Sequence, residues 1–445
     1  MLLALFLAIT LLFSSNRVLG AMVPVTSRDT PAHRAVLHFM RGVNLGNDLE
    51  YQAGNPAATQ TYTEHDLDLI RQEGFDHIRL PVGWHLGSGA APAYQVSPVL
   101  FQKADTLINA ALARGLGVIL DWHSFDEFMG NPTGSTNKLY VIWKQVATHY
   151  AAYSNSLVFD LLNEPNGAAT TAVMNGIYPE LIRQVHLINP DRTLFVAPGQ
   201  WSGIGELKTG TNPGLVLPND DLNLIVTVHC YEPYYFTHQG AEWALPDTAT
   251  VGVKFPGPPS TPLKASSTIT HDWVLQWFKD YNSKPASSNP SSPYSFQSLL
   301  KQLRTWADYW GRPVHLSEWG CYEKAENTSR LAFHQAFRTA LDAQRLGWAM
   351  WDWKAGFHYL KNGIPDPPGM REAIFPPPVL TITDGATIRA EGSLGKTFIL
   401  QQADPVFAPL QWQGVSTQSL TTNLFMYPIP TNSQTADLYR ILWQK

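Results

Sequence analysis

Eight short apolar runs recur along the first 351 residues of the chain. Each run is rich in β-branched or apolar side chains and ends in polar or aromatic residues, and most are followed by a helical pattern. Strands that alternate with helices are typical of right-handed βαβ units and a parallel sheet. Eight units predict an α/β fold, a (β/α)8 TIM barrel. The runs are 40–44, 77–81, 118–121, 158–162, 194–196, 224–228, 314–316 and 348–351.

Helix signals follow several of these runs. Thr63 is an N-cap candidate for a helix that ends at Gly74, and Ser97 before Pro98 predicts a helix that runs to Gly115. Residues 327–328 open another helix, which ends before residue 347. The alternative is an open doubly wound sheet, but the loop 42–46 lacks the third glycine of a phosphate-binding loop.

The ends of the chain differ from the barrel pattern. Residues 2–13 form an apolar run too short to span a bilayer, and a small-residue cleavage site precedes residue 21, so residues 1–20 are predicted to be a signal peptide. The product would be secreted or periplasmic and not membrane-bound after signal removal. Arg17 lies after the run and not before it. A misassigned start codon and a membrane-tethered N-terminus are the alternatives.

The predicted catalytic domain comprises residues 21–375. Two further segments depart from its strand–helix repeat, one inside this domain and one after it. Residues 246–295 are rich in Pro, Ser and Thr and follow the sixth run, which predicts a long insertion on the active-site side with a short helix at 272–281. After the prolines at 376–378, alternating residues at 380–383, 397–400 and 438–443 replace helical periodicity. We therefore expect residues 376–445 to be a proline linker and a small all-β C-terminal domain.

Charge and cysteine content exclude several functions. The 31 basic and 36 acidic residues give a net charge of −5, with no basic run, so a nucleic-acid partner is not expected. Cys230 and Cys321 both follow predicted strands, and a disulfide or two buried free thiols are both open. The histidines lack close metal-ligand spacing, so neither a metal nor a cofactor is expected. The oligomeric state stays open.

Two glutamates carry the strongest chemical signal. Glu164 and Glu318 each lie where an apolar run ends, after the fourth and the seventh predicted strands. A charged carboxyl at such a place costs desolvation, so the fold must gain from holding it there. Active sites of these barrels lie at the C-terminal ends of the strands. If the barrel brings the two glutamates together, they form the acid and nucleophile pair of a retaining glycosidase.

Polar neighbours fit the same site. Asn163 can hydrogen-bond a sugar 2-hydroxyl, or it can simply belong to an Asn-Glu-Pro turn. His229 and Tyr231 project to the same side of a strand end, where the Tyr231 hydroxyl would hold Glu318 ionised. Arg79 lies within a strand and needs an anionic partner, either Glu318 or Asp121.

Aromatic and imidazole groups complete the prediction. His123 contacts a sugar hydroxyl or hydrogen-bonds at the barrel rim. Asp121 competes with Glu164 for the acid role, but pairing with Arg79 or His123 is the role expected of it. Trp351 is expected to form a floor for the sugar ring. For the other aromatics near strand ends, core packing is at least as expected: Trp84, Trp122, Trp201, Tyr234, Tyr235, Trp243, Trp319 and Trp353.

Seven segments, in order, resemble glycoside hydrolase family 5 from about Met40 to Asn362: 42–47, 78–81, 121–123, 162–165, 228–231, 317–320 and Trp351. The resemblance implies that Glu164 is the acid/base and Glu318 the nucleophile. It places Arg79, His123, Asn163, His229, Tyr231 and Trp351 in supporting positions. Residues 231–243 are similar to a stretch of a bacterial endoglucanase branch, some members of which also accept mannan.

These observations lead to one expected function and three alternatives. We expect a secreted retaining endo-β-1,4-glucanase, a cellulase that cleaves β-linked polysaccharides or oligosaccharides by double displacement. An endo-β-mannanase or another β-glycanase would use the same mechanism. A carbohydrate-binding scaffold without catalysis and a metal-dependent barrel hydrolase that uses His123 and His229 are the remaining alternatives.

Overall fold

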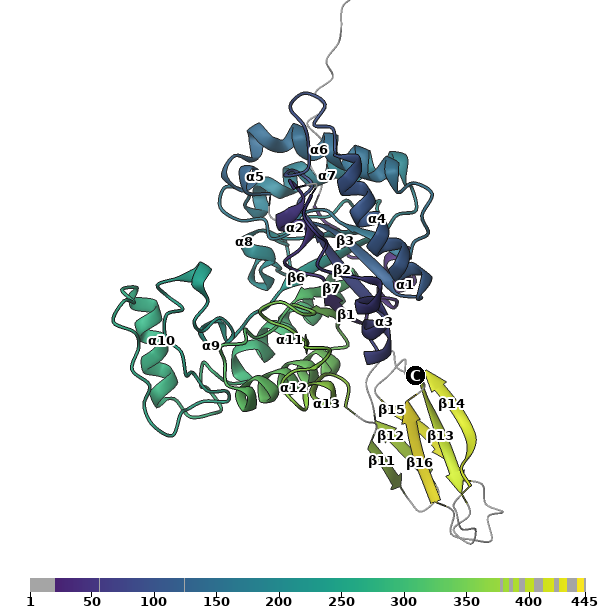
Figure 1. The fold of residues 1–445 in the computed structure, drawn as a ribbon, viewed down its shortest axis with the longest axis vertical. Helices are drawn as coiled ribbons and strands as arrows, with labels where there is room; N and C mark the ends of the chain where they lie inside the picture. Colours follow the sequence, from purple (N-terminus) through teal and green to yellow (C-terminus); the bar gives the residue numbers. More distant parts are fainter. Residues whose placement is uncertain are drawn as a thin grey trace, which may run out of the picture.

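The computed structural model describes residues 21–55, 57–123, 125–376, 379–383, 387–391, 397–403, 411–419, 424–429 and 438–443. The predicted signal peptide, residues 1–20, lies outside them. Eight parallel strands pair in sequence order, and β8 pairs back to β1, which confirms the TIM barrel (Figure 1). The strands are β1 (Arg41–Asn44), β2 (His77–Val82), β3 (Gly117–Trp122), β4 (Leu157–Asp160), β5 (Leu194–Val196), β6 (Leu224–His229), β7 (Val314–Glu318) and β8 (Gly347–Met350).

Helices surround this barrel, and their predicted starts are confirmed. Thr63 and Asp66 form a capping box at the start of α3, and Gly74 ends that helix with a left-handed φ of 100°. Pro98 is the first residue of α4, after the N-cap Ser97. The helices along the barrel are α1 (Pro31–Val36), α2 (Leu49–Gln52), α3 (Glu64–Glu73), α4 (Pro98–Ala113), α5 (Asp126–Gly130), α6 (Pro132–His149), α7 (Thr171–Ile188), α8 (Gly199–Ser202), α11 (Tyr294–Trp310), α12 (Asn327–Ala343) and α13 (Met370–Ile374), with the 3-10 turn η1 (Ile204–Glu206).

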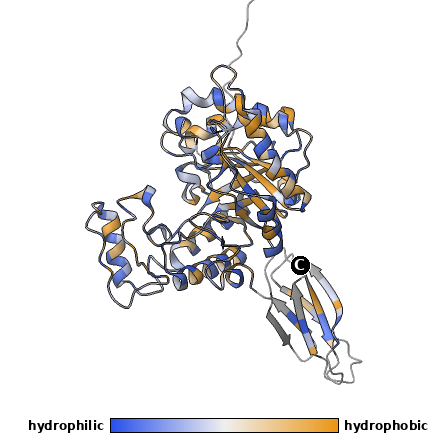
Figure 2. Ribbon diagram, viewed as in Figure 1, coloured by the Kyte–Doolittle hydropathy of each residue, from blue (hydrophilic) through white to orange (hydrophobic). Residues whose placement is uncertain are grey.

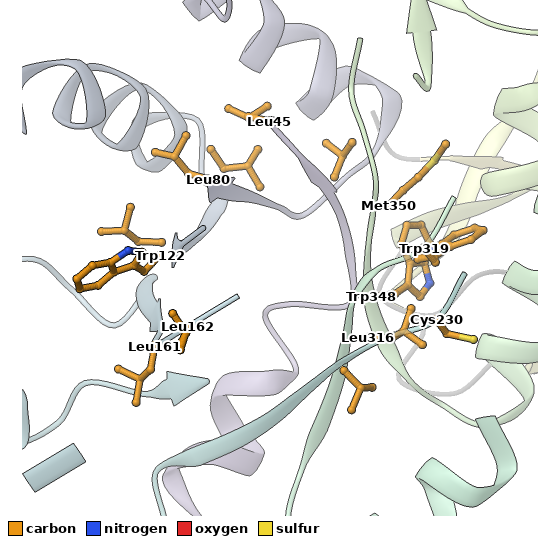
Figure 3. Packing of buried hydrophobic residues seen from close by; sticks show 14 of the residues in the cluster. Leu45, Leu80, Trp122, Leu161, Leu162, Cys230, Leu316, Trp319, Trp348 and Met350 are labelled. Carbon is orange, nitrogen blue, oxygen red and sulfur yellow. The ribbon is translucent and has the colours of Figure 1, made fainter. Parts of the chain in front are cut away.

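The apolar core has two layers. The larger layer lies between strands and helices and includes Leu80, Trp122 and Trp348, drawn in Figure 3; the hydropathy colouring of Figure 2 shows the strands as predominantly apolar. A small separate cluster fills the barrel interior: Phe39, Ile119, Val158, Phe195 and Ile225, with Ala32. Side chains two residues further along a strand point to the same side. The inner apolar positions of β3, β4 and β6 are therefore followed by polar ones at the C-terminal end.

The predicted insertion follows β6. The helix α9 (Tyr234–Thr237) and the 3-10 turn η2 (Glu242–Ala244) precede its predicted bounds, 246–295. Within them lies α10 (Asp272–Ser283), so the helix expected at 272–281 is confirmed. Figure 1 shows α10 beyond α9, away from the barrel strands. Val274, Phe278 and Tyr281 are the buried face of α10. All three belong to the larger apolar cluster described above, so the insertion is continuous with the core of the barrel.

The C-terminal part is antiparallel, as expected. After the hairpin β9 (Leu360–Lys361) and β10 (Ile364–Pro365), two three-stranded sheets form in the orders β11-β12-β15 and β14-β13-β16. Their strands are β11 (Val379–Thr383), β12 (Thr387–Glu391), β13 (Thr397–Ala403), β14 (Gln413–Ser419), β15 (Leu424–Pro428) and β16 (Leu438–Trp443). None of the helices in the described ranges is long and apolar enough to cross a membrane.

Cys230 and Cys321 are two buried free thiols, so the second of the two sequence alternatives holds. Burial raises the pKa of each thiol to about 12, which makes both unreactive as nucleophiles near neutral pH.

Candidate active site

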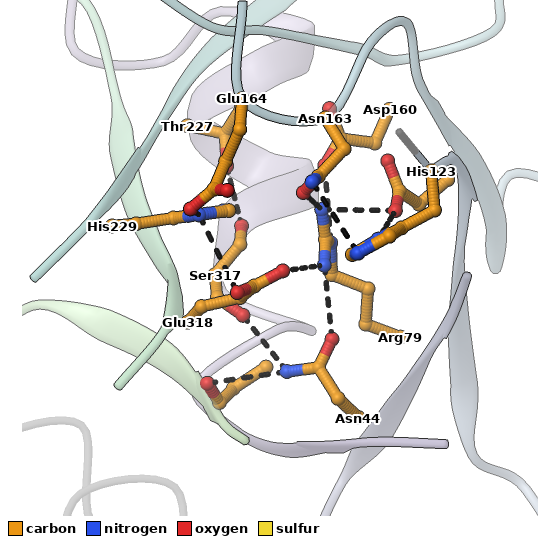
Figure 4. Close-up of polar contacts among 12 residues, drawn as sticks. Asn44, Arg79, His123, Asp160, Asn163, Glu164, Thr227, His229, Ser317 and Glu318 are labelled. Atoms are coloured by element: carbon orange, nitrogen blue, oxygen red, sulfur yellow. Dashed lines mark hydrogen bonds and ion pairs between the residues drawn. The ribbon is translucent and has the colours of Figure 1, made fainter. Parts of the chain in front are cut away.

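Strand register brings the polar residues together at the C-terminal end of the barrel. Asn44 of β1 lies opposite Arg79 of β2, and Asp121 of β3 lies opposite Asp160 of β4. On the other side of the barrel, a register shift after Val228 places His229 opposite Glu318. The two halves meet across the barrel axis (Figure 4).

Arg79 is the hub of this network. Its side chain is fully buried, and its guanidinium contacts three carboxylates and two amides. The two predicted partners, Glu318 and Asp121, are therefore both correct. A buried cation of this kind is tolerated only because its N–H groups are paired with anions and acceptors. The distances are 2.6 Å to Glu318, 3.0 Å to Asp121, 3.1 Å to Asp160, 2.8 Å to Asn163 and 3.0 Å to Asn44.

Both oxygens of Glu318 are held by the protein. Oε1 accepts from Arg79 at 2.6 Å, and Oε2 accepts from the Tyr231 hydroxyl at 2.9 Å, as predicted for Tyr231. Burial and the neighbouring carboxylates raise the pKa of Tyr231 well above its ordinary value, so the phenol is a neutral donor. Glu318 is thereby fixed in orientation and its negative charge is stabilised.

Glu164 lies at the same place in a different environment. Its Oε1 is 2.8 Å from Nδ1 of His229, and Nδ1 is also 3.5 Å from Oε2 of Glu318. Burial raises the pKa of Glu164 to about 7 and lowers the pKa of His229 to about 4. A neutral imidazole therefore stands beside Glu164. The backbone of Glu164 has φ of +47°, a left-handed conformation that a residue with a Cβ adopts only when its surroundings hold it there.

The separation of the two glutamates is short. One oxygen of each carboxylate and one nitrogen of His229 all lie within 4.8 Å of one another. Retaining glycosidases have carboxyl groups about 5–5.5 Å apart, whereas inverting enzymes leave about 6.5–9.5 Å for a water molecule. The arrangement matches the retaining geometry. The same three atoms also have a spacing that a cation could occupy.

His123 lies on the opposite wall. Its Nδ1 is 2.8 Å from Asp121, and its Nε2 is 3.4 Å from the amide nitrogen of Asn163. Burial opposes protonation, but the hydrogen bond and charge of Asp121 outweigh it and raise the pKa of His123 to about 9. Asp121 thus pairs with both residues proposed for it, and the hydrogen bond that His123 donates to Asp121 agrees with the rim alternative.

Trp351 stacks on His123, with ring centroids 5.3 Å apart and an interplanar angle of 18°. Gly46 lies against the ring, where an added Cβ would come within 2.7 Å of it, so this position must be glycine. Trp351 is only 9% exposed and Trp84, Trp122, Trp319 and Trp353 are fully buried core residues. Among the tryptophans that the sequence places near strand ends, Trp201 and Trp243 are exposed to solvent, at 56% and 62%.

Sequence reasoning missed several polar residues of the site. Asp160 binds Arg79, and burial raises the pKa of Asp160 above its ordinary value. Asn44 donates to the backbone of Ser317 and Met350 while accepting from Arg79, so it joins β1, β7 and β8. A polar side chain inside an otherwise apolar strand is the signal that could have identified both.

Comparison with known proteins agrees with this geometry. The family described as Cellulase (glycosyl hydrolase family 5) matches residues 40–356, more than half of the chain. Endoglucanase 3 of Fibrobacter succinogenes is 26% identical over 362 residues, which cover 76% of this chain and 53% of the relative. Cellulase/esterase CelE of Acetivibrio thermocellus is 25% identical over 352 residues, 74% of this chain and 37% of the relative. The chain thus spans about half, or less, of the length of these relatives.

Solved structures are similar over the barrel. Thermotoga maritima Cel5A in complex with mannotriose is 26% identical with a TM-score of 0.64, and the match covers 77% of this chain and 99% of that one. Its complex with cellobiose is 27% identical with a TM-score of 0.65 and the same coverage. The family match, the barrel and the carboxylate pair agree: this chain belongs to glycosyl hydrolase family 5, the cellulase family.

Proposed function

We propose that this protein is a secreted retaining endo-β-1,4-glucanase. The observation that carries the proposal is the carboxylate pair, because one oxygen of Glu164 lies within 4.8 Å of one oxygen of Glu318 at the C-terminal end of the barrel. The relatives named endoglucanase and the cellobiose-bound structure support a β-glucan substrate. The mannotriose-bound structure supports an endo-β-mannanase as the alternative.

The proposed mechanism is a double displacement. Glu318 attacks the anomeric carbon while Glu164 donates its proton to the glycosidic oxygen, so the leaving sugar departs with a new hydroxyl. Glu164, now a carboxylate, then removes a proton from water, which attacks the anomeric carbon and releases Glu318. Two inversions leave the configuration unchanged.

Neighbouring side chains give each of the two carboxylates a different role in the proposed mechanism. Arg79 and Tyr231 fix the two oxygens of Glu318 for in-line attack. The neutral imidazole of His229 can donate to Glu164 once that residue has lost its proton. The amide of Asn163, oriented by Arg79, is placed to hydrogen-bond the sugar 2-hydroxyl, and the stacked ring of Trp351 provides the floor.

A panel of polysaccharides tests the substrate. We expect the purified protein to release reducing sugar from carboxymethyl cellulose and mixed-linkage β-glucan with a rapid fall in viscosity. Xylan, xyloglucan, glucomannan and mannan complete the panel. Release from mannan alone would replace the glucanase with a mannanase, and no release from any polysaccharide would contradict a glycanase function.

Substitution of the nucleophile tests the mechanism. We expect Glu318→Gln to abolish turnover, because an amide cannot form the glycosyl ester, while oligosaccharide binding and the folded structure persist. NMR of the first product in wild-type enzyme should show the β-anomer. Near-normal activity of the variant, or an α-anomer as first product, would refute the assignment.

Chelation separates this mechanism from a metal-dependent one. The cluster of Glu164, His229 and Glu318 could in principle ligate a cation, but the double displacement needs none. We expect dialysis against EDTA to leave kcat unchanged. A loss that Zn²⁺ or Mn²⁺ restores would favour the metal-dependent alternative.

Export is proposed from the apolar run at residues 2–13 alone. Expression of the full chain in a bacterial host, followed by N-terminal sequencing of the exported protein, tests it. We expect the mature protein to begin near Ala21. Retention of residues 1–20 on a membrane-bound product would support the tethered alternative.

A further inference from the structure

The insertion after β6 carries an exposed tryptophan that is held rigidly. Trp273, near the start of α10, is 63% exposed. One face of its ring stacks on His271, with centroids 4.2 Å apart and an interplanar angle of 14°. His271 is fixed in turn by Asp247, at 2.7 Å from Nδ1. Two further rings of the same helix, Trp277 and Phe278, pack on Tyr235 of α9, with centroids 5.3 and 6.3 Å apart.

The ring also borders a groove of about 660 Å³ on the insertion. Polar side chains surround the tryptophan there: Lys264, Asp272, Gln276, Lys279 and Asn282. This volume lies in the range of small-molecule binding sites, about 300–1,000 Å³. The wall at Leu263 is rigid, because the Asn282 amide bonds both its N–H and its C=O, at 2.8 and 2.9 Å. An aromatic plate among mixed hydrogen-bonding groups suits a neutral ligand with many hydroxyls.

Aromatic contacts connect this groove to the active site. Tyr235 is a neighbour of Tyr234, with ring centroids 5.6 Å apart, and Tyr234 stacks on His238 at 4.3 Å. His238 meets Tyr231 at 4.9 Å, and Tyr231 holds the nucleophile Glu318. Phe278 lines the groove and packs on Tyr235, so a series of packed rings connects the groove with Tyr231.

We propose that the groove at Trp273 is a distal binding surface for the glycan chain whose cleavage the barrel catalyses, which rests on the function proposed above. The free face of Trp273 packs against the apolar face of a sugar ring, and the lysine, glutamine and asparagine side chains bind its hydroxyls. Stacking on a preordered aromatic plane brings large contact area at low entropic cost. The insertion would thus act on long substrates and not on short ones.

Comparison of a long and a short substrate tests this proposal. For Trp273→Ala we expect kcat/KM on mixed-linkage β-glucan to fall roughly 5- to 10-fold, the loss of one aromatic contact. Hydrolysis of an aryl β-cellobioside, which is too short to reach α10, should stay within about twofold of wild type. Trp273→Tyr should restore part of the loss, because it retains an aromatic face. The matched control is Tyr309→Ala, another exposed aromatic, at the C-terminal end of α11.

Each outcome has a distinct meaning. Equal activity of Trp273→Ala and wild type on the polymer would overturn the distal surface while the proposed function stands. An equal loss on both substrates would show a general structural effect of the substitution and would also overturn it. A wild-type dimer that Trp273→Ala converts to a monomer in size-exclusion chromatography would assign the groove to a second copy of the chain instead. If the wild-type enzyme hydrolyses no β-glucan at all, the proposed function itself is overturned, and the distal surface that rests on it falls with it.

Discussion

Glu164 and Glu318 lie side by side, yet their partners differ in charge. Glu318 contacts the guanidinium of Arg79, which favours a negative carboxylate. Glu164 contacts His229, whose pKa of about 4 leaves it uncharged near neutral pH. Burial without a direct cationic partner raises the pKa of Glu164 to about 7, so a large share of the molecules carry the proton near neutral pH. Two carboxylates with different environments are how one site supplies both an acid and a nucleophile.

The pH profile should report the proton on Glu164. Burial raises the pKa of Glu164 to about 7, and the first step requires the protonated form. We therefore expect kcat/KM to fall as pH rises through about 7, approaching a tenfold loss per pH unit above it. Initial rates with an aryl β-cellobioside between pH 4 and 9 measure this limb.

Glu164→Gln is the control for that profile. The variant has no proton to lose, so its residual activity should show no limb near pH 7. A wild-type limb displaced to pH 9 or above would assign the titration to another group.

Tyr231 offers a second test at the residue scale. Tyr231→Phe removes the hydroxyl that donates to Oε2 of Glu318 at 2.9 Å. A hydrogen bond to a charged group contributes about 1.5–3 kcal/mol, so we expect kcat to fall roughly 10- to 100-fold with little change in KM. Steady-state kinetics on cellohexaose give both constants. A change in KM alone would place Tyr231 in substrate binding and not in nucleophile positioning.

The residue scale also shows what the sequence could indicate. Glu164 and Glu318 stood out because each carboxyl follows an apolar strand, where only function or pairing can compensate for desolvation. Asp160 gave a weaker signal, since its contact with Arg79 depends on the register between β3 and β4. The exposure of Trp201 and the burial of Trp84 depend on loop conformation, which local sequence does not specify.

At the scale of elements, the strands and long helices could be predicted from hydrophobic periodicity and helix caps. The backbone course of the insertion could not. Its irregular backbone is fixed by buried side chains that replace missing ladder hydrogen bonds. Asn289 donates to the carbonyls of Tyr281 and Lys284, each at 2.9 Å, and accepts from the N–H of Ser291. Such contacts join residues with no periodic relation, so only the short helix α10 was predictable.

Gln239 tests this account of the insertion. Its fully buried amide accepts from the N–H groups of Gly252 and Val253 and donates to the carbonyls of Phe236 and Val253. Gln239→Ala leaves these backbone groups without partners, so we expect the free energy of unfolding to fall by about 2–3 kcal/mol. Urea denaturation followed by circular dichroism measures the change.

Gln276→Ala is the matched control, because Gln276 is an exposed residue of α10 whose amide bonds only the side chain of Asp280 among the described contacts. Its stability should change by less than about 0.5 kcal/mol. If Gln239→Ala were as stable as this control, the insertion would not depend on that amide.

At the scale of the whole molecule, the barrel and the C-terminal sheets are separate in their backbone pairing. The barrel closes on itself from β1 to β8, and among the described residues the strands β11–β16 pair only with one another. The helix α13 belongs with the barrel, since Met370 and Ile374 are fully buried and Phe375 packs on Phe75 with centroids 4.9 Å apart. We therefore propose that the catalytic domain ends close to the predicted boundary, between residues 375 and 376.

Two truncations test that boundary. A chain that ends at residue 376 keeps α13, so we expect it to fold with a barrel Tm within a few degrees of the full chain and to retain its kcat on carboxymethyl cellulose. A chain that ends at Gly369 loses Met370, Ile374 and Phe375, each of which contributes about 1.5–3 kcal/mol when buried. It should unfold at much lower temperature or fail to accumulate. Equal destabilisation by both truncations would mean that the C-terminal sheets support the barrel directly, and the proposed domain division would have to be abandoned.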